Sequence, residues 1–448
     1  MNERGNKSES ASVAVYETLR LPTLVGLVVA NMIGAGVFTT SGFALADLGS
    51  ANRVMLAWAV GGVIAICGAL SYGGLARRFT ESGGEYLFLS RALHPLAGFI
   101  AGWVSLLAGF TGAIAFAALA FETYISPLLA FTLPPKSLAI ALIVTAALLH
   151  GARVRAGIGV QNVVVFLKFA LLIIFIAAAV FAAKVIGVGS PAPSAPEFSL
   201  TAFAGSLVWI SLSYSGFNAA VYVAGEARDA QTVVPRAMWI GTLIVTILYL
   251  ILNSIFVYLA PYEAVVGRED VAAIAAQSIG GQSLALLVRA IIALSLLTSV
   301  FAMIMIGPRV YAKMAEDKVF PALFRFQGDV PRAAIAFQAV AGVLVVAFST
   351  LKNLLSYLGF TLSLSAALTV FCLFLIPRAE SQSVKIPAYP FAPVLFVGAT
   401  VFLASLAVWR NPAELIATLL TVLSGIVLYF ILKRHHKVDS DDKIERIV

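Results

Sequence analysis

The sequence is divided into apolar stretches, and this division constrains the fold more than any other feature. Most of the stretches are about 18 to 28 residues long, the length that an α-helix needs to cross a hydrocarbon core roughly 30 Å thick. Hydrophobic residues make up 60% of the chain and charged residues 12%, so a water-soluble domain of this length could not cover its apolar surface. The pattern predicts an all-α integral membrane protein with twelve spans, near residues 20–48, 53–76, 91–121, 137–151, 157–183, 200–226, 237–260, 283–308, 331–350, 353–377, 389–408 and 412–432.

Positively charged residues are distributed unevenly among the segments that connect these spans. With the N-terminus in the cytoplasm, 22 lysines and arginines lie in cytoplasmic segments and seven in outer segments. This excess fits the positive-inside rule and places both termini in the cytoplasm. The net charge of +8 therefore reports orientation in a membrane rather than binding to nucleic acid. The compact chain with short tails is expected in the inner (plasma) membrane of a bacterium.

Two predicted spans are interrupted by glycine and polar residues at corresponding places in the two halves of the chain. The first span contains NMIGAGVF at 31–38, and the sixth contains SYSGFN at 213–218. Backbone that leaves the helix inside a bilayer must line a cavity or find another partner, because an unsatisfied amide in hydrocarbon costs several kcal/mol. Such a pair of interrupted spans indicates the binding site of a transporter.

The two interruptions offer opposite charges to a ligand. After the first one, the amides of Gly34 to Val37 begin a new helix at the positive end of its dipole, which makes an anion site. Gly34 and Gly36 let a ligand approach the backbone. The first half of span 6 ends near Ser215 with free carbonyls, which attract a cation. A carboxylate beside an ammonium describes the α-amino acid group, although glycine pairs of this kind also mark close packing of membrane helices.

The topology predicts an inverted repeat. Span 1 enters from the cytoplasm and span 6 from outside, so the two five-span halves have opposite orientations, and spans 11 and 12 are peripheral. The predicted divisions are a cytoplasmic tail at 1–19, a first repeat at 20–184, a second repeat at 200–377, spans 11 and 12 at 389–432, and a cytoplasmic tail at 433–448.

Lys168 lies in the inner half of the predicted fifth span. A buried ammonium costs about 2.5–3.5 kcal/mol on insertion scales, so an unpaired one is disfavoured. It is expected either to contact helix-end carbonyls or to have a pKa lowered by desolvation, which would let it carry a proton. A lysine that reaches the cytoplasmic surface with its long side chain is the alternative.

Other charged residues gather at the cytoplasmic ends of the spans. Glu226, Arg228, Asp229 and Arg236 surround the inner end of span 6, either as a gate or as an ordinary solvated network, and Arg309 is expected to support a loop that opens and closes. No nucleophile elbow, phosphate-binding lysine loop or metal-binding spacing occurs in the sequence. We therefore expect neither an enzyme nor a bound cofactor or metal.

Several motifs, in the right order, resemble the amino acid–polyamine–organocation (APC) superfamily. The resemblance implies a LeuT-like fold, a 5+5 inverted repeat with broken spans 1 and 6. Within the superfamily the chain resembles bacterial relatives of the L-type amino acid transporters, which exchange or take up amino acids without sodium. The similarity covers about residues 20–432 and is carried by Gly34 to Gly36, Gly83 to Tyr86, Gln161 to Lys168, Tyr214 to Glu226 and Arg309 to Pro321.

The resemblance also implies roles for individual residues. The predicted substrate site comprises Met32, Ile33, Gly34, Ala35, Gly36, Leu212, Ser213, Ser215, Gly216, Phe217 and Asn218. The amides of Ala35 and Gly36 would hold the substrate carboxylate, and the carbonyls of residues 32, 212, 213 and 215 its ammonium. Lys168 and Ser299 would occupy the place of the coupling cation. Leu212 departs from many relatives, which carry there a bulky aromatic residue that gates the site from outside.

The predicted function is sodium-independent secondary transport of neutral amino acids by alternating access, as an exchanger or a proton symporter. The stretch around Asn218 offers no acid for a cationic substrate, which favours a neutral one of small to medium size. The partners are therefore the amino acid, the lipid bilayer and, in a symporter, protons. A membrane amino-acid sensor and a transporter of cationic amino acids or polyamines are the alternatives.

Overall fold

In the computed structural model the regular secondary structure of the described residues is helical, apart from one isolated parallel β-bridge between Leu19 and Ala227. The residues described are 19–151, 170–182, 196–316, 318–325, 331–376 and 387–445, without the side chains of Ile306, Arg309, Lys313 and 435–445. The all-α class is thereby confirmed.

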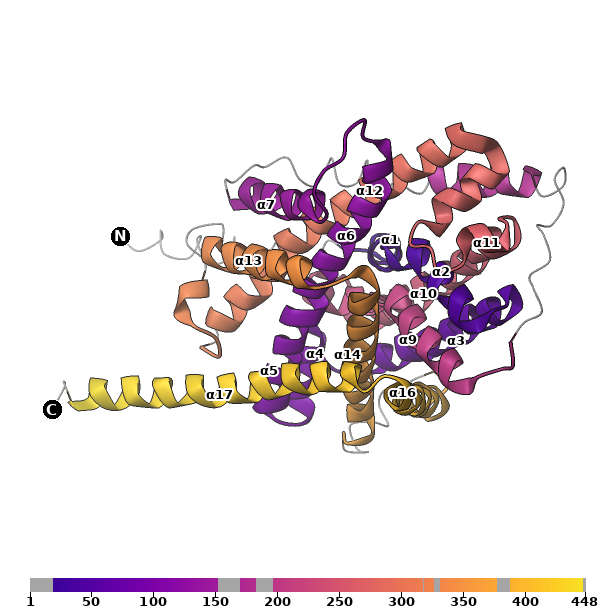
Figure 1. The fold of residues 1–448 in the computed structure, drawn as a ribbon. Helices are drawn as coiled ribbons and strands as arrows, with labels where there is room; N and C mark the ends of the chain where they lie inside the picture. The colour runs from indigo at the N-terminus through magenta and orange to yellow at the C-terminus, as the bar shows by residue number, and fades with distance from the viewer. Residues whose placement is uncertain are drawn as a thin grey trace, which may run out of the picture.

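Figure 1 shows the arrangement of these helices. Their bounds in chain order are α1 Leu21–Met32, α2 Gly36–Leu48, α3 Ala51–Ala76, α4 Gly84–Ala92, α5 Pro95–Val104, the π-helix η1 Ser105–Gly112, α6 Ala113–Ile125, η2 Ser126–Leu128, α7 Ser137–Gly151, Ala170–Ala182, α9 Leu200–Tyr214, the 3-10 helix η3 Ala219–Glu226, α10 Ala230–Tyr258, α11 Tyr262–Val265, α12 Val271–Glu316, η4 Ala322–Phe324, α13 Arg332–Phe348, α14 Leu351–Phe371, η5 Cys372–Phe374, α16 Phe391–Arg410 and α17 Ala413–Glu445.

The described residues contain eight helices that are long and apolar enough to cross a membrane, and the bent pair α1 and α2 makes a ninth. Three shorter apolar helices, Ser137–Gly151, Ala170–Ala182 and Arg332–Phe348, lie where spans 4, 5 and 9 are predicted. The chain is thus a multi-pass membrane protein, while the twelve-span inverted repeat stays a prediction.

Several boundaries differ from the predicted ones because polar residues continue or interrupt the helices. The helix expected from residue 91 begins at Pro95, since the side chain of His94 accepts a hydrogen bond from the amide of Leu96 and caps it. The helix expected to end at 432 continues through Glu445 in α17. The short helix α4 precedes the third span and has no apolar run that would have predicted it.

The two interrupted spans lie in the middle of the helical packing. α1 and α2 are bent by 42° at residues 33–35, and α9 and η3 meet at residues 215–218. α10 packs against both α1 and α3, while α9 packs against α2, α3, α14 and α16. The interruptions are therefore held between long continuous helices.

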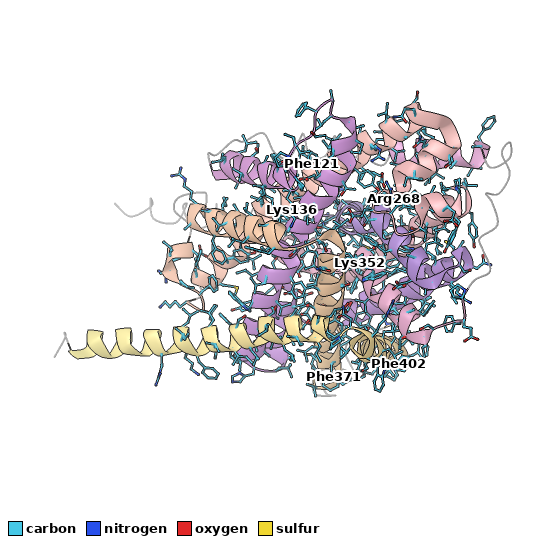
Figure 2. All side chains as sticks on the ribbon, in the orientation of Figure 1. Phe121, Lys136, Arg268, Lys352, Phe371 and Phe402 are labelled. Atoms are coloured by element: carbon cyan, nitrogen blue, oxygen red, sulfur yellow. The ribbon has the colours of Figure 1, made fainter. Side chains whose placement is uncertain are left out.

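The last two helices lie at the edge of the molecule. α17 runs along one side in Figure 1, and its C-terminal part reaches beyond the other helices. A third of the apolar part of α16 is buried and 17% of that of α17, the lowest shares among the eight helices. Large apolar side chains such as Phe371 and Phe402 are exposed on this outer surface (Figure 2), as expected for residues that contact lipid.

Candidate functional site

The interruption of the first span leaves helical amides free at the start of α2. The amide of Gly34 donates to the carbonyl of Met32 (2.9 Å), and that of Phe38 donates to Ala35 (3.1 Å). The amides of residues 35–37 lie in the first turn, where an α-helix supplies no acceptor. A side-chain carbon added at Gly34 would meet nothing within 4 Å, so there is room beside these amides.

The interruption of the sixth span lies directly against that of the first. Gly216 has a φ of +100°, which favours glycine, and a carbon added there would lie 3.0 Å from the carbonyl of Asn31. A carbon added at Gly36 would lie 2.5 Å from Oγ of Ser213. Close packing between the two spans therefore already accounts for glycine at 36 and 216, whereas Gly34 faces open space.

Tyr249 of α10 joins the two interruptions. Its hydroxyl donates to the carbonyl of Met32 and, at 3.0 Å, to that of Ser213. The side chain is fully buried, and its ring lies 5.2 Å from Tyr214 and 5.4 Å from Trp58. Two of the carbonyls expected to bind an ammonium group thus share one hydroxyl. Sequence reasoning missed this residue.

Next to Tyr249, a series of hydrogen-bonded side chains connects α2 to α3, α9 and α10. Asn253, one turn along α10, donates to the carbonyl of Tyr249 (2.8 Å) and accepts from the hydroxyl of Ser41 (2.5 Å). The indole of Trp58 donates to the same serine (2.9 Å), and Thr40 lies 3.1 Å from the Ser213 hydroxyl. The spacing of Tyr249 and Asn253 is the signal that could have identified them, because both are polar and four residues apart on one face of an apolar helix.

A buried acid lies next to Asn218. The carboxylate of Glu85, in the first turn of α4, is 6% exposed. Its Oε1 accepts hydrogen bonds from Asn218 (2.5 Å) and from the Tyr72 hydroxyl (3.0 Å), and its Oε2 accepts one from Tyr222. The sequence places no acid near Asn218, because Glu85 is 133 residues away in the chain. The fold therefore brings a negative charge to the edge of the site that sequence reasoning did not foresee.

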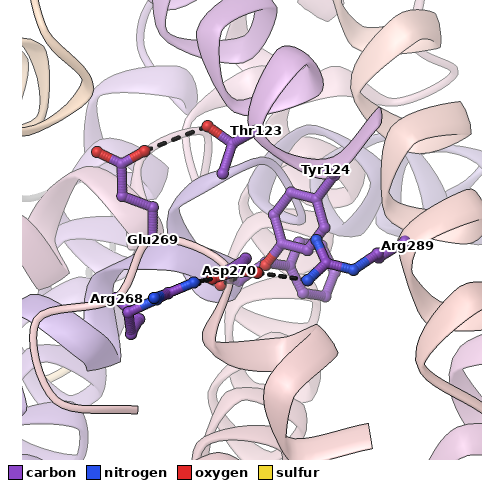
Figure 3. A network of polar contacts seen from close by, with 7 residues as sticks. Thr123, Tyr124, Arg268, Glu269, Asp270 and Arg289 are labelled. Carbon is purple, nitrogen blue, oxygen red and sulfur yellow. Dashed lines mark hydrogen bonds and ion pairs between the residues drawn. The ribbon is translucent and has the colours of Figure 1, made fainter. Parts of the chain in front are cut away.

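The far end of α2 is fastened by the loop before α12. The amide of Gly267 donates to the carbonyl of Gly42 (2.8 Å). Asp270 in this loop is 6% exposed and pairs with Arg289 (2.5 Å) and, more loosely, with Arg268 (3.4 Å), as Figure 3 shows. The neighbouring Glu269 accepts from Thr123 (3.2 Å). This end of the broken span is closed.

The two halves of the first span differ in burial. Eleven of the thirteen residues of α2 are buried, against four of the twelve residues of α1. Thr23, Gly26 and Asn31 are exposed on α1. An exposed asparagine at membrane depth does not face lipid without a large cost. Among the described residues, α1 is therefore less covered by neighbouring helices than α2.

The structure places the remaining predicted residues in different ways. Lys168 lies outside the described residues, and of Arg309 only the backbone, within α12, is described. Ser299 is partly exposed on α12 and donates to the carbonyl of Ser295 (3.0 Å). Glu226 and Arg228 are exposed, and their backbones form the β-bridge with Leu19 through two hydrogen bonds of 3.1 Å. No ion pair of either side chain occurs within the described part of the chain.

Comparison with known proteins finds relatives over most of the chain. A family model described as amino acid permease matches residues 19–432. The large neutral amino acids transporter small subunit 2 of Homo sapiens is 26% identical over 441 residues, covering 95% of this chain and 82% of that protein. The b(0,+)-type amino acid transporter 1 of Mus musculus is 24% identical over 448 residues (95% and 90%). The serine/threonine exchanger SteT of Bacillus subtilis (strain 168) is 23% identical over 426 residues (91% and 95%).

All three relatives are transporters and none is an enzyme, in agreement with the sequence. The match of the family model extends over nearly the whole chain, including both interrupted spans. The chain therefore belongs to the amino acid permease family of the APC superfamily, and its general function is amino acid transport.

Proposed function

We propose that this protein is a sodium-independent secondary transporter of neutral amino acids that works by alternating access, as an exchanger or a proton symporter. The observation that carries the proposal is the contact between the two interrupted spans. It brings the amides at the start of α2 next to the helix-end carbonyls of α1 and α9, several of which already accept a hydrogen bond from Tyr249 or from a backbone amide. An α-amino acid carries the matching pair of opposite charges.

The substrate carboxylate binds at the amides of Ala35 and Gly36, beside the open space at Gly34. A helix N-terminus stabilises an anion through its free amides and its dipole. The ammonium binds at the carbonyls of Leu212 and Ser215, and at those that Tyr249 contacts. Because Tyr249 is fully buried and hydrogen-bonded to both spans, it holds these carbonyls in position before the substrate arrives.

The unequal burial of α1 and α2 supports alternating access. The closed end of α2 faces outward if both termini are cytoplasmic, as the charge distribution predicts, and the more open α1 then leads to the cytoplasm of a bacterial cell. During transport the two repeats, 20–184 and 200–377, move relative to each other, so that the site opens to the cytoplasm and to the outside in turn. Lys168 and Ser299 supply the coupling site, and Glu226, Arg228 and Arg309 belong to the cytoplasmic gate.

Two observations support a neutral substrate. The described residues that line the interruptions carry no free acid, since the one nearby carboxylate, Glu85, already accepts three hydrogen bonds. In addition, one relative is named for large neutral amino acids and another for serine and threonine.

The test is uptake of radiolabelled alanine and leucine into sodium-free proteoliposomes that contain only this protein. Vesicles are preloaded with the same amino acid or left empty, with and without an inward proton gradient. Uptake only into preloaded vesicles indicates an exchanger, and concentrative uptake into empty vesicles that depends on the gradient indicates a symporter. Binding without uptake under every condition would refute transport and leave a sensor.

A further inference from the structure

Glu85 is a buried carboxylate whose charge no cation balances among the residues that the structure describes. Its hydrogen-bond donors are two tyrosine hydroxyls and one amide, all neutral, and no described lysine or arginine forms an ion pair with it. Taking a charge out of water is costly unless it is paired and hydrogen-bonded. A cation that reached the space next to Glu85 would therefore be stabilised by the carboxylate.

Asn218 separates this acid from the interruption of the sixth span. Asn218 is partly exposed, whereas Glu85 is 6% exposed and Tyr72 is fully buried. The side-chain nitrogen of Asn218 donates to Oε1 of Glu85. In the chain, Asn218 is two residues from Gly216, which packs on α1. The carboxylate is thus one side chain away from the proposed substrate site.

Three of the hydrogen-bonding positions of the Glu85 carboxylate are occupied. A carboxylate accepts about four hydrogen bonds, and Tyr72, Tyr222 and Asn218 provide three. The ring of Tyr222 lies directly on Gly84, where an added carbon would be 2.4 Å from the ring, so the start of α4 is pressed against η3. Among the three donors Tyr72, Tyr222 and Asn218, Asn218 is the one that lies at the interruption of the sixth span.

We propose that Glu85 is a specificity-determining acid that Asn218 screens from the substrate. While the screen is in place, the site takes amino acids with uncharged side chains. Without it, the carboxylate binds the distal ammonium or guanidinium of a cationic amino acid. This inference rests on the proposed function, because it assumes that the substrate binds at the two interruptions.

The same contacts would also arise if Glu85 only held the inner half of span 6 in place. The two roles make different predictions. A purely structural role changes the affinity for all substrates together, whereas a screened acid changes the ratio of affinities for cationic and neutral substrates. The ratio is therefore the quantity to measure.

The experiment compares the purified wild type with Asn218→Ala, Glu85→Gln and the double variant. Equilibrium binding of radiolabelled leucine is displaced by unlabelled leucine or lysine, so the readout does not require transport. Hydrogen bonds to charged groups are among the strong ones in proteins, and we expect Asn218→Ala to shift the lysine-to-leucine affinity ratio toward lysine by at least about tenfold. The shift should disappear in the double variant. Ser82→Ala, which removes only the bond from the Gly225 amide, is the matched control and should leave the ratio unchanged.

An unchanged ratio in Asn218→Ala, or a shift that persists when Glu85 is replaced, would overturn the inference. If Asn218→Ala does not fold or bind, Tyr222→Phe exposes Oε2 instead and should produce a smaller shift in the same direction, again lost with Glu85→Gln. The absence of that shift would equally overturn it. Leucine binding by the wild type tests the proposed function separately, because a wild type that prefers lysine contradicts the neutral substrate whatever the variants do.

Discussion

Replacing Tyr249 by phenylalanine removes the hydroxyl that joins the two interrupted spans and leaves the ring in place. The hydroxyl contacts the carbonyls of Met32 and Ser213, and the residue is fully buried. It has one proton, so one buried hydrogen bond is lost at any moment, which costs about 1–2 kcal/mol of unfolding free energy. The ring contacts with Trp58 and Tyr214 remain, so no cavity larger than one oxygen atom forms.

The loss should also appear in substrate binding, because the carbonyls that Tyr249 positions are those proposed to bind the ammonium. A cost of about 1.4 kcal/mol corresponds to roughly a tenfold weaker affinity. Tyr258→Phe is the matched control. Tyr258 lies on α10, as Tyr249 does, and its hydroxyl donates to Asn52 of α3 in an exposed position (2.6 Å). Its effect on stability is expected to stay within about 0.5 kcal/mol.

The assay is reversible unfolding in detergent, combined with equilibrium binding of radiolabelled leucine for the wild type and both variants. We expect Tyr249→Phe to lose stability and affinity together, and Tyr258→Phe to lose neither. If the two variants behave alike, the buried bridge does not hold the site, and the reasoning is refuted.

Three further predictions concern the broken spans and their surroundings. Gly36→Ala should lower the free energy of unfolding by about 1–3 kcal/mol in the same assay, because the added carbon overlaps α9. The carbon added by Gly34→Ala has room, so this variant should lower only the affinity for leucine. Lys168→Ala should abolish or slow proteoliposome uptake, and normal uptake kinetics would exclude both of its proposed roles. Asp270→Asn breaks the ion pair with Arg289. In a chain without Cys67 and Cys372, labelling from outside of a single cysteine introduced into α2 should then become faster; unchanged labelling would show that this pair does not close the outer end.

The positions of both interruptions could be predicted because each signal is local. Glycine and serine within an apolar run permit a break in the helix, and the structure ends α1 and α9 within two residues of these positions. Gly216 needs its positive φ, which no neighbouring residue would adopt as readily. Local chemistry thus determines where the spans break.

The partners of the interruptions could not be predicted, because they come from distant parts of the chain. Tyr249 is 217 residues from Met32, and Glu85 is 133 residues from Asn218. Glu122 shows the same limit. Its place at the end of an apolar run suggests contact with water, but its carboxylate accepts hydrogen bonds from the amides of Lys136 (2.5 Å) and Ala139 (2.9 Å) and caps α7. The apolar stretches predict the long helices, whereas these contacts depend on how the helices pack.

The central claim, that the amino acid binds at the two interruptions, is tested most directly by substrate protection of Gly34→Cys. The variant is made in a chain with Cys67→Ala and Cys372→Ala, and Gly26→Cys, about 12 Å away along α1, is the control. The account predicts that saturating leucine slows thiol labelling at position 34 by tenfold or more, in proportion to occupancy, and has little effect at position 26. Equal labelling at position 34 with and without bound leucine would contradict it.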